Sequence, residues 1–141
     1  MLAKVSIRSL PVLDAPPAQP RLDGVRIKMA AGEAAPVFNG GPWRFIAYLE
    51  FLPGTLAWRG NHYHEKKREY FYVIRGRLHG VFEDVDTGER AEAELVAGDV
   101  IVIEPRCAHA FRALEHAQAI ECSPLEFDAS DAYPRVVGTN D

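Results

Sequence analysis

The chain has 141 residues, 48% of them hydrophobic and 26% charged, a balance that is typical of a globular protein and excludes an intrinsically disordered one. Its length suits one domain with a buried core, and its net charge of −4 lacks the basic surface that nucleic-acid binding needs. No apolar run approaches the roughly 20 residues that span a bilayer, and residues 1–8 lack the apolar core of a signal peptide. We therefore expect a cytoplasmic protein without nucleic-acid or membrane partners, whose two cysteines are reduced.

The first 42 residues alternate strand patterns with segments that break regular structure. Residues 4–8 and 23–29 each predict a short strand. Four prolines between positions 10 and 20 exclude a helix or a central strand there and indicate an arm on the surface. Residues 30–42 carry the glycines, prolines and asparagine of a loop. We expect this whole region, residues 1–42, to pack on the remainder of the fold.

From residue 43 to residue 123 the sequence predicts a dense series of short strands, the core of the fold. Each strand is bounded by turn residues, among them Gly76 and Gly98, at the spacing of antiparallel hairpins. This pattern predicts an all-β sandwich or barrel. In the tail, residues 124–141, Asp128 and Asp131 resemble the cap and first turn of a single helical turn. The expected strands cover residues 43–52, 55–58, 61–64, 69–74, 77–84, 90–96, 99–103, 109–113 and 117–122.

A pair of histidines followed by a carboxylate stands at the centre of the sequence. His62 and His64 are two residues apart, so on an extended strand both imidazoles project from one face. Glu69 follows after a short polar connection that can bring its carboxylate beside them. Two imidazoles and a carboxylate suit a first-row divalent metal, with a fourth ligand from elsewhere in the fold. His109, which follows the turn at Pro105, is the expected fourth ligand.

These two segments resemble the two motifs of the cupin superfamily. In the first, four residues separate His64 from Glu69 and six separate Glu69 from Gly76; in the second, His109 follows Gly98 by eleven positions. The resemblance covers roughly residues 43–123 and implies an all-β, single-domain, cupin-type jelly-roll β-barrel with an N-terminal arm and a short C-terminal helical turn. It also implies one divalent metal ion inside the mouth, with zinc, iron, manganese and nickel all compatible. The implied ligands are His62, His64, Glu69 and His109.

Three positions depart from the usual cupin motifs. Leu56 stands where a glycine usually precedes the first histidine, Arg106 ends a turn that usually reads Pro-x-Gly, and Ala113 replaces an occasional asparagine. These positions shape turns, so the departures bear on loop geometry more than on metal ligation.

The segments around the histidines and the tail at residues 123–134 also resemble small cupins of bacterial surface-polysaccharide and deoxysugar biosynthesis. Those relatives include sugar-nucleotide ketoisomerases, epimerases and metal-binding modules of capsule enzymes. In the ketoisomerase relatives the two histidines shuttle protons without a metal, and the glutamate position holds no acidic ligand. Here Glu69 is present, and a carboxylate beside two neutral imidazoles favours a dication. The expected function is a metal-dependent isomerase or epimerase acting on a sugar nucleotide or a related carbonyl compound.

Two other functions stay open from the sequence. Three histidines and a carboxylate are also the ligand set of cupin dioxygenases and related iron or nickel enzymes, and a single cupin can bind a small molecule or a metal without catalysis. A dioxygenase needs a route for O₂ to the metal, whereas an isomerase needs a second proton-transfer group. The candidates for that group, which would otherwise pack on the outer face or at a subunit contact, are His79, Tyr48, Tyr70 and Tyr72.

Strand parity predicts which side chains line the pocket. Trp58 shares the face of the first two histidines if the strand is regular, Phe71 the face of the glutamate, and Phe111 the face of the last histidine. A bulge at Gly60 would reverse the parity of Trp58. Together with Arg59, these aromatic residues are the expected contacts of a small-molecule ligand, such as a sugar or an aromatic compound.

The remaining side chains of these segments bear on what the protein binds. Residues 66–68 are all basic and form either a solvated loop or a contact for an anionic ligand. Tyr63, Tyr70, Tyr72 and Ile74 are expected to point outward and are too apolar for a wholly solvated face. We therefore expect a homodimer formed through that sheet.

Overall fold

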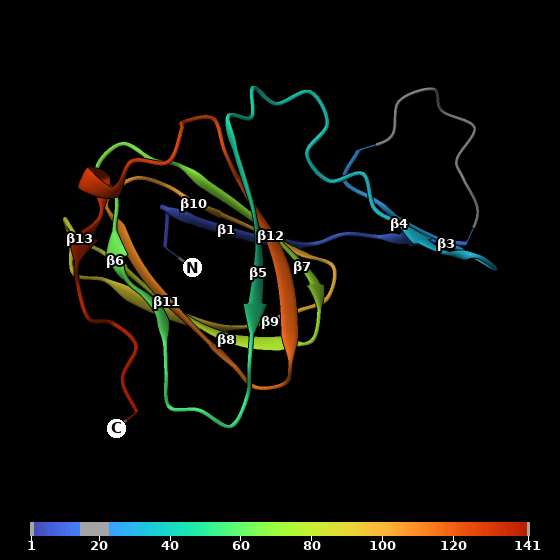
Figure 1. Ribbon diagram of the computed structural model, residues 1–141. Coiled ribbons are helices and arrows are strands. Elements are labelled where there is room, and N and C mark those ends of the chain that lie inside the picture. Colours follow the sequence, from blue (N-terminus) through green and yellow to red (C-terminus); the bar gives the residue numbers. More distant parts are fainter. Residues whose placement is uncertain (1, 15–22, 141) are drawn as a thin grey trace.

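The computed structural model describes residues 2–14 and 23–140, a part of the chain that folds into β-strands and one 3-10 helical turn (Figure 1). The strands form two five-stranded sheets and one three-stranded sheet. The first large sheet contains, in spatial order, β1 (Val5–Ser9), β10 (Asp99–Ile103), β7 (Glu69–Arg75), β12 (Ala117–Ser123) and β5 (Phe45–Phe51). The second contains β13 (Tyr133–Pro134), β6 (Arg59–Tyr63), β11 (Cys107–Ala113), β8 (Arg77–Asp84) and β9 (Arg90–Val96). The small sheet contains β2 (Val12–Leu13), β3 (Arg26–Met29) and β4 (Gly32–Ala34).

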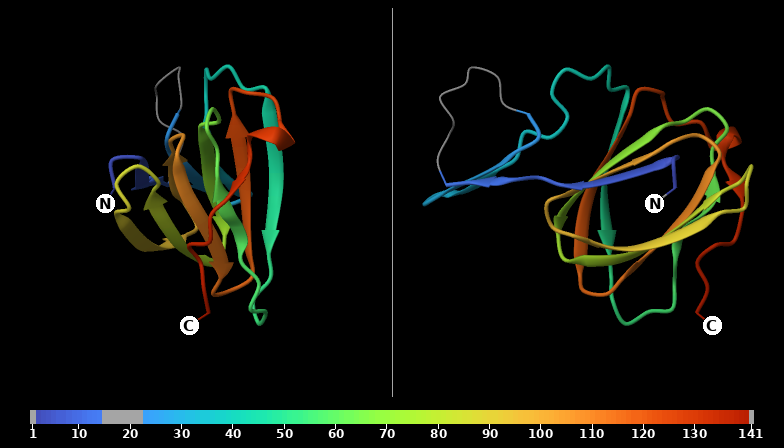
Figure 2. Two further views of the ribbon diagram at one scale, coloured as in Figure 1. Left: turned by 90° about the vertical axis from the view of Figure 1, so that its left-hand side faces the viewer. Right: turned by 180° about the vertical axis from the view of Figure 1, so that it is seen from behind.

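The two large sheets face each other and curve around a common interior (Figure 2). The core between them contains branched and aromatic side chains such as Phe82, Leu95 and Ile101, each at most 1% exposed. Within the described residues every strand pairing lies inside one sheet, so the two layers form a β-sandwich with no pairing that closes it into a barrel. The predicted all-β class is therefore confirmed, and the expected barrel takes the form of this sandwich.

The largest difference from the predicted strands lies just before the first histidine. Residues 55–58, expected as a strand, are a loop in which Leu56 is 74% exposed. In β6, which follows, Gly60 and Asn61 have positive φ angles of 108° and 56°. The pairing of β6 with β11 skips Asn61, which is the extra residue of a β-bulge. The regular alternation of side chains is thus interrupted inside this strand.

The N-terminal region adds one strand to the core and a small sheet outside it. β1 pairs antiparallel with β10 at the edge of the first large sheet, close to the strand expected at residues 4–8. β3 lies within the strand expected at residues 23–29, whereas β4 forms in a stretch that was expected to be a loop. Residues 15–20 of the expected proline-rich arm lie outside the described residues; before them, β2 pairs in parallel with β3.

The segment after β4 covers the outer face of the first large sheet. Tyr72 is only 7% exposed and packs in a cluster with Leu10 and Phe38. Tyr70 lies with its ring centre 5.9 Å from that of Phe38 and 4.8 Å from that of Trp43. The chain's own residues therefore cover the tyrosines on which the homodimer prediction rested.

The other two residues of the homodimer prediction, Tyr63 and Ile74, do not form a shared outward surface either. Tyr63 lies on β6 in the other sheet, where its ring stacks on Tyr133 at a centroid distance of 5.4 Å. Ile74, at 45% exposure, faces solvent. The reason given for a dimer is therefore wrong, and the oligomeric state itself stays a prediction.

The C-terminal segment supports the strand that carries the first histidine. The predicted helical turn is present at Ala129–Asp131, and Asp128 caps it by accepting a hydrogen bond from Ser130 N at 3.0 Å. β13 then pairs with β6, and Asn61 Oδ1 accepts two hydrogen bonds from the backbone of the tail at 2.8 Å each. This short turn is the helical element of the described residues. Among these residues, no helix has the length and hydropathy needed to cross a membrane.

Candidate metal centre

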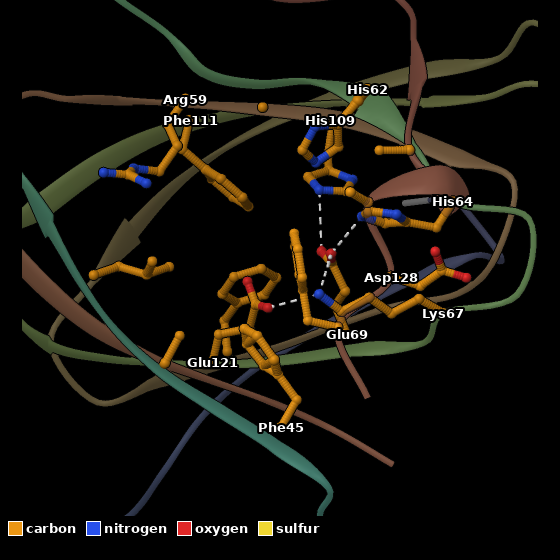
Figure 3. Close-up of a pocket in the computed structure, with 17 residues that line it drawn as sticks. Phe45, Arg59, His62, His64, Lys67, Glu69, His109, Phe111, Glu121 and Asp128 are labelled. Atoms are coloured by element: carbon orange, nitrogen blue, oxygen red, sulfur yellow. Dashed lines mark hydrogen bonds and ion pairs between the residues drawn. The ribbon is translucent and has the colours of Figure 1, made fainter. Parts of the chain in front are cut away.

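The four side chains of the predicted ligand set meet in the space between the two large sheets (Figure 3). His62 lies on β6, His64 directly follows that strand, Glu69 begins β7, and His109 on β11 pairs with His62. One ligand atom from each residue lies within 4.8 Å of those of the others. Glu69 and His109 are 2% exposed and His64 is 9% exposed. The fold thus joins the two separate motifs in one buried cluster.

Backbone carbonyl groups determine which nitrogen is protonated in two of the imidazoles. His64 Nδ1 lies 2.5 Å from Asp131 O, and His109 Nδ1 lies 3.1 Å from Cys107 O. Because a carbonyl oxygen only accepts, each Nδ1 carries a hydrogen, and in the neutral ring Nε2 then carries a lone pair. Both Nε2 atoms face Glu69: that of His64 is 2.7 Å from Oε1, and that of His109 is 3.0 Å from Oε2.

Two neutral imidazoles in these tautomers would direct lone pairs at a carboxylate, an arrangement that a positive charge between them stabilises. His64 Nε2 and Glu69 Oε2 are buried and have no hydrogen-bond partner of suitable geometry, in spite of the short separations. A divalent ion ligated by these atoms would satisfy both. The hydrogen bond from each Nδ1 to a backbone carbonyl is also the usual support of a metal-binding histidine. The residues present therefore fit one divalent metal ion.

The electrostatics of the cluster favour the ligating states of His62 and Glu69 and, at His64, favour a positive charge beside the carboxylate. Burial, with smaller contributions from His109 and His64, lowers the pKa of His62 to about 4, so this ring is neutral near pH 7. Burial also lowers the pKa of His64, but the Glu69 carboxylate 2.7 Å away raises it by more. Burial raises the pKa of Glu69, yet the imidazoles of His109 and His64 beside it hold it well below its usual range. Glu69 is therefore a carboxylate.

The loop between His64 and Glu69 is held by the C-terminal turn. Asp131 is 7% exposed, and its carboxylate accepts hydrogen bonds from three consecutive backbone N–H groups of that loop at 2.9, 3.2 and 3.1 Å. Its carbonyl oxygen also accepts the Nδ1 hydrogen of His64. One residue of the tail therefore positions two of the ligands. The sequence prediction gave Asp131 only a place in a helical turn.

Arg106 supports the same loop from the second motif. Its φ angle of 61° is the left-handed conformation that the usual glycine of this turn adopts readily. Its backbone N–H donates to His64 O at 2.7 Å, and its guanidinium forms ion pairs with Glu65 at 2.7 Å and Asp86 at 2.8 Å. The departure from the usual motif thus keeps the turn geometry.

A cavity of about 390 Å³ opens beside the ligand cluster. Apart from the ligands, its charged lining residues are Arg59, Lys67, Glu121 and Asp128. Apolar walls with a small number of polar groups are typical of a site for a small molecule. The apolar walls are formed mainly by Phe45, Ala47, Leu49, Phe71, Phe111 and Phe127.

Three of the four residues predicted to contact a ligand line this cavity: Arg59, Phe71 and Phe111. Trp58 does not, so its parity prediction is wrong. It packs on the outer side of the second sheet, in a cluster with Val137 of the tail, and its ring centre lies 5.4 Å from that of His79. The physical reason is the bulge, because the extra residue Asn61 lies between Trp58 and His62 and reverses the face.

Three charged residues of the cavity, Lys67, Glu121 and Asp128, were not predicted to lie there. Lys67 belongs to the basic run at 66–68, yet it is 9% exposed rather than solvated. Its Nζ lies 2.9 Å from Glu121 Oε2, 3.5 Å from Glu69 Oε1 and 4.6 Å from the centre of the Phe45 ring. The sequence does contain an indication that Glu121 faces the cavity, because it shares strand parity with Ala119. A charged side chain on an otherwise apolar inward face indicates a functional position.

None of the four residues considered as a second proton-transfer group lines the cavity. His79 lies beside Trp58 on the outer side of the second sheet. Tyr48 is 59% exposed on β5. Tyr70 and Tyr72 face the N-terminal segment. An isomerase reaction in this cavity would need a different group.

Comparison with known families agrees with the two motifs. The cupin domain profile matches residues 47–121, more than half of the chain. The chain belongs to the cupin family. No curated protein matches this cupin in sequence.

Solved structures similar to this cupin include a ketoisomerase, an epimerase and a capsule protein. The sugar 3,4-ketoisomerase QdtA from Thermoanaerobacterium thermosaccharolyticum, in complex with TDP, has a TM-score of 0.72 and 16% identity over 94% of this chain and 88% of its own. The 3'-monoepimerase ChmJ from Streptomyces bikiniensis, in complex with dTDP-quinovose, has a TM-score of 0.72 and 15% identity over 93% of this chain and 69% of its own. The capsular polysaccharide assembling protein CapF from Staphylococcus aureus has a TM-score of 0.58 and 26% identity over 65% of this chain and 27% of CapF. The likeness to QdtA and ChmJ concerns the fold alone.

Proposed function

We propose that this cupin is a metal-dependent isomerase or epimerase that acts on a sugar nucleotide or a related carbonyl compound. The proposal depends on one observation. The Nε2 atoms of His64 and His109 converge on the Glu69 carboxylate beside an apolar cavity, an arrangement that suits a bound cation next to a substrate. The similar folds support the substrate class: QdtA is seen with TDP, and a mutant of it with TDP-4-keto-6-deoxyglucose.

Some residues of the cavity would hold the ion, and others would hold the substrate. A divalent ion supplies Lewis acidity that polarises a carbonyl oxygen. The rings of Phe71 and Phe111 provide an apolar wall for a sugar ring and exclude water from the reacting carbons. Arg59 brings a permanent positive charge to the same cavity, which suits a phosphate of the nucleotide. The residues that would hold the ion are His62, His64, Glu69 and His109.

Two measurements on the purified protein test this function. Metal analysis should find about one divalent ion per chain, whether zinc, iron, manganese or nickel. Incubation with TDP-4-keto-6-deoxyglucose, followed by NMR, should show the keto group move or a neighbouring centre invert. Chelation should abolish the reaction, and the ion should restore it.

The alternatives give different results in the same experiments. A protein without stoichiometric metal, or a loaded protein that leaves the sugar nucleotide unchanged, contradicts the proposal. Oxygen uptake by the iron-loaded protein with small keto acids or phenols would instead identify a dioxygenase. Thermal stabilisation by a ligand without turnover would identify a binding module.

We also keep the homodimer and the cytoplasmic location as proposals. Sedimentation at micromolar concentration tests the first, and a monomer there contradicts it. Fractionation of the cells that make the protein tests the second.

A further inference from the structure

This inference rests on the proposed function and concerns the proton-transfer group that an isomerase needs. Among the charged residues of the cavity that are not ligands, Arg59 does not deprotonate in proteins. Asp128 is engaged as the cap of the 3-10 turn, where Oδ1 accepts hydrogen bonds from Ser130 N at 3.0 Å and Ser130 Oγ at 2.6 Å. Lys67 is held near two carboxylates. Glu121 remains as the group that can give and take a proton.

Glu121 and the histidines occupy facing sheets. Glu121 lies on β12 of the first large sheet, whereas His62 and His109 lie on β6 and β11 of the second. Figure 3 shows Lys67 reaching towards the carboxylates of both Glu69 and Glu121. A molecule in the cavity therefore has the ligand cluster on one side and the Glu121 carboxylate on another.

One oxygen of Glu121 is held and the other is available. Oε2 accepts a hydrogen bond from Lys67 Nζ at 2.9 Å. For Oε1, the described residues provide no hydrogen-bond donor, and this atom is not among the fully buried unpaired ones. The side chain as a whole is 12% exposed and lines the cavity. The Lys67 bond thus fixes the carboxylate while Oε1 stays within reach of a ligand.

The surroundings of Glu121 suit proton transfer. Burial raises the pKa of Glu121, against the opposing effect of the Lys67 ammonium. The adjacent β5 contributes the apolar Phe45 to this part of the cavity and no charge. A carboxyl group with a raised pKa binds a proton more readily than an ordinary one and can return it.

We propose that Glu121 is a catalytic residue that carries the proton between two carbons of the sugar. Its carboxylate removes the proton from the carbon next to the keto carbon; the C–H electron pair becomes the C=C bond of an enediolate, and the keto oxygen takes the negative charge. Glu121 then returns the proton to the former keto carbon. The hydroxyl proton of the first carbon moves to the former keto oxygen as the new C=O bond forms. One hydrogen moves between carbons and one between oxygens, so no oxidant or reductant is needed.

The test uses the metal-loaded full chain and TDP-4-keto-6-deoxyglucose in deuterated water, with NMR following exchange of the hydrogen next to the keto carbon. Glu121→Gln keeps an oxygen that accepts from Lys67 but cannot take up a proton. We expect its exchange rate to fall about 100-fold or more, with unchanged metal content and unchanged affinity for TDP. The matched control is Glu115→Gln, since Glu115 pairs with Arg77 in an exposed turn, and it should exchange at the wild-type rate.

The outcomes separate the two proposals. Equal exchange by wild type and Glu121→Gln overturns the role of Glu121 and leaves the proposed function standing. A wild type that binds the sugar nucleotide with neither exchange nor product overturns the proposed function and this inference with it. A slow Glu121→Gln that has also lost its metal assigns Glu121 a structural role and overturns catalysis by it.

A second variant applies if Glu121→Gln does not fold. Glu121→Asp keeps the charge that pairs with Lys67 and withdraws the carboxylate from the cavity by one methylene. Because such a displacement is costly for proton transfer, we expect a loss of about tenfold or more. An unchanged rate in this variant overturns the role of Glu121.

Discussion

The two ends of the cavity are held in different ways. At the ligand end, His64 and His109 each donate to a backbone carbonyl, and Asp131 holds the loop that leads to Glu69. The other end is bounded by β5, which is an edge strand, and by the tail, where Phe127 is 68% exposed. The ligand end is thus fixed by contacts within the chain, as a preorganised metal site requires.

Binding of the ion and recognition of the substrate are thus assigned to different ends of the cavity. Atoms that must meet an ion tolerate little displacement, so they are supported by several elements. Side chains at an edge strand and at exposed positions such as Phe127 can vary with the substrate without disturbing the ion. Substitutions at the ligand end should therefore change metal content, and those at the other end should change turnover.

The variant His64→Ala should lose nearly all of its metal. The substitution removes one ligand and leaves Glu69 Oε1 without its closest neighbour. We expect metal content to fall from about one ion per chain to below about a tenth, while circular dichroism still reports a folded β protein. His116→Ala is the control, since His116 is exposed and pairs only with Glu50 at 2.9 Å, and it should keep its metal. Full metal content in His64→Ala would refute the ligand assignment.

Gly60→Ala should weaken the ligand end without removing a ligand. A Cβ at Gly60, whose φ is 108°, would lie 2.6 Å from His109 O, so β6 must move away from β11 where His62 faces His109. We expect metal affinity to fall about tenfold or more and the thermal midpoint to drop, as measured by metal titration and thermal unfolding. Gly54→Ala is the matched control, because φ there is 78° with nothing within 4 Å. It should cost about 1 kcal/mol of backbone strain and no metal. Equal metal affinities in the two variants would contradict this account.

The same contrast explains what the sequence could predict. The ligand set could be predicted because it depends on short spacings within two motifs. The all-β class could be predicted because turn residues recur at hairpin spacing. Trp58 was misplaced because a bulge at Asn61, stabilised by the distant tail, changes strand parity. The burial of Lys67 was missed because it depends on Asp131, 64 positions later in the chain. Contacts between remote segments leave no local pattern.

Removing Asp131 should loosen the ligand end by a smaller amount. In Asp131→Ala the three backbone N–H groups of the loop lose their acceptor, while the carbonyl that binds His64 is retained. We expect a 10- to 100-fold loss of metal affinity, roughly the range for outer-shell partners, with full occupancy at saturating metal. Ser130→Ala, one residue earlier in the same turn, should bind metal as the wild type does. A titration in which both variants match the wild type would remove Asp131 from the support of the site.

The rate of thiol labelling compares the two ends directly. Cys107 is 1% exposed, and burial raises its pKa from the ordinary 9.0 to about 12. Thiol reagents attack the thiolate, so at pH 8 burial leaves roughly a thousandth of the usual reactive form, and labelling should become appreciable only as the pH approaches 12. Since Cys107 O binds His109 Nδ1, fast labelling of Cys107 in the native protein would mean that the ligand end opens. Phe127→Cys at the exposed end should label at the rate of a free thiol.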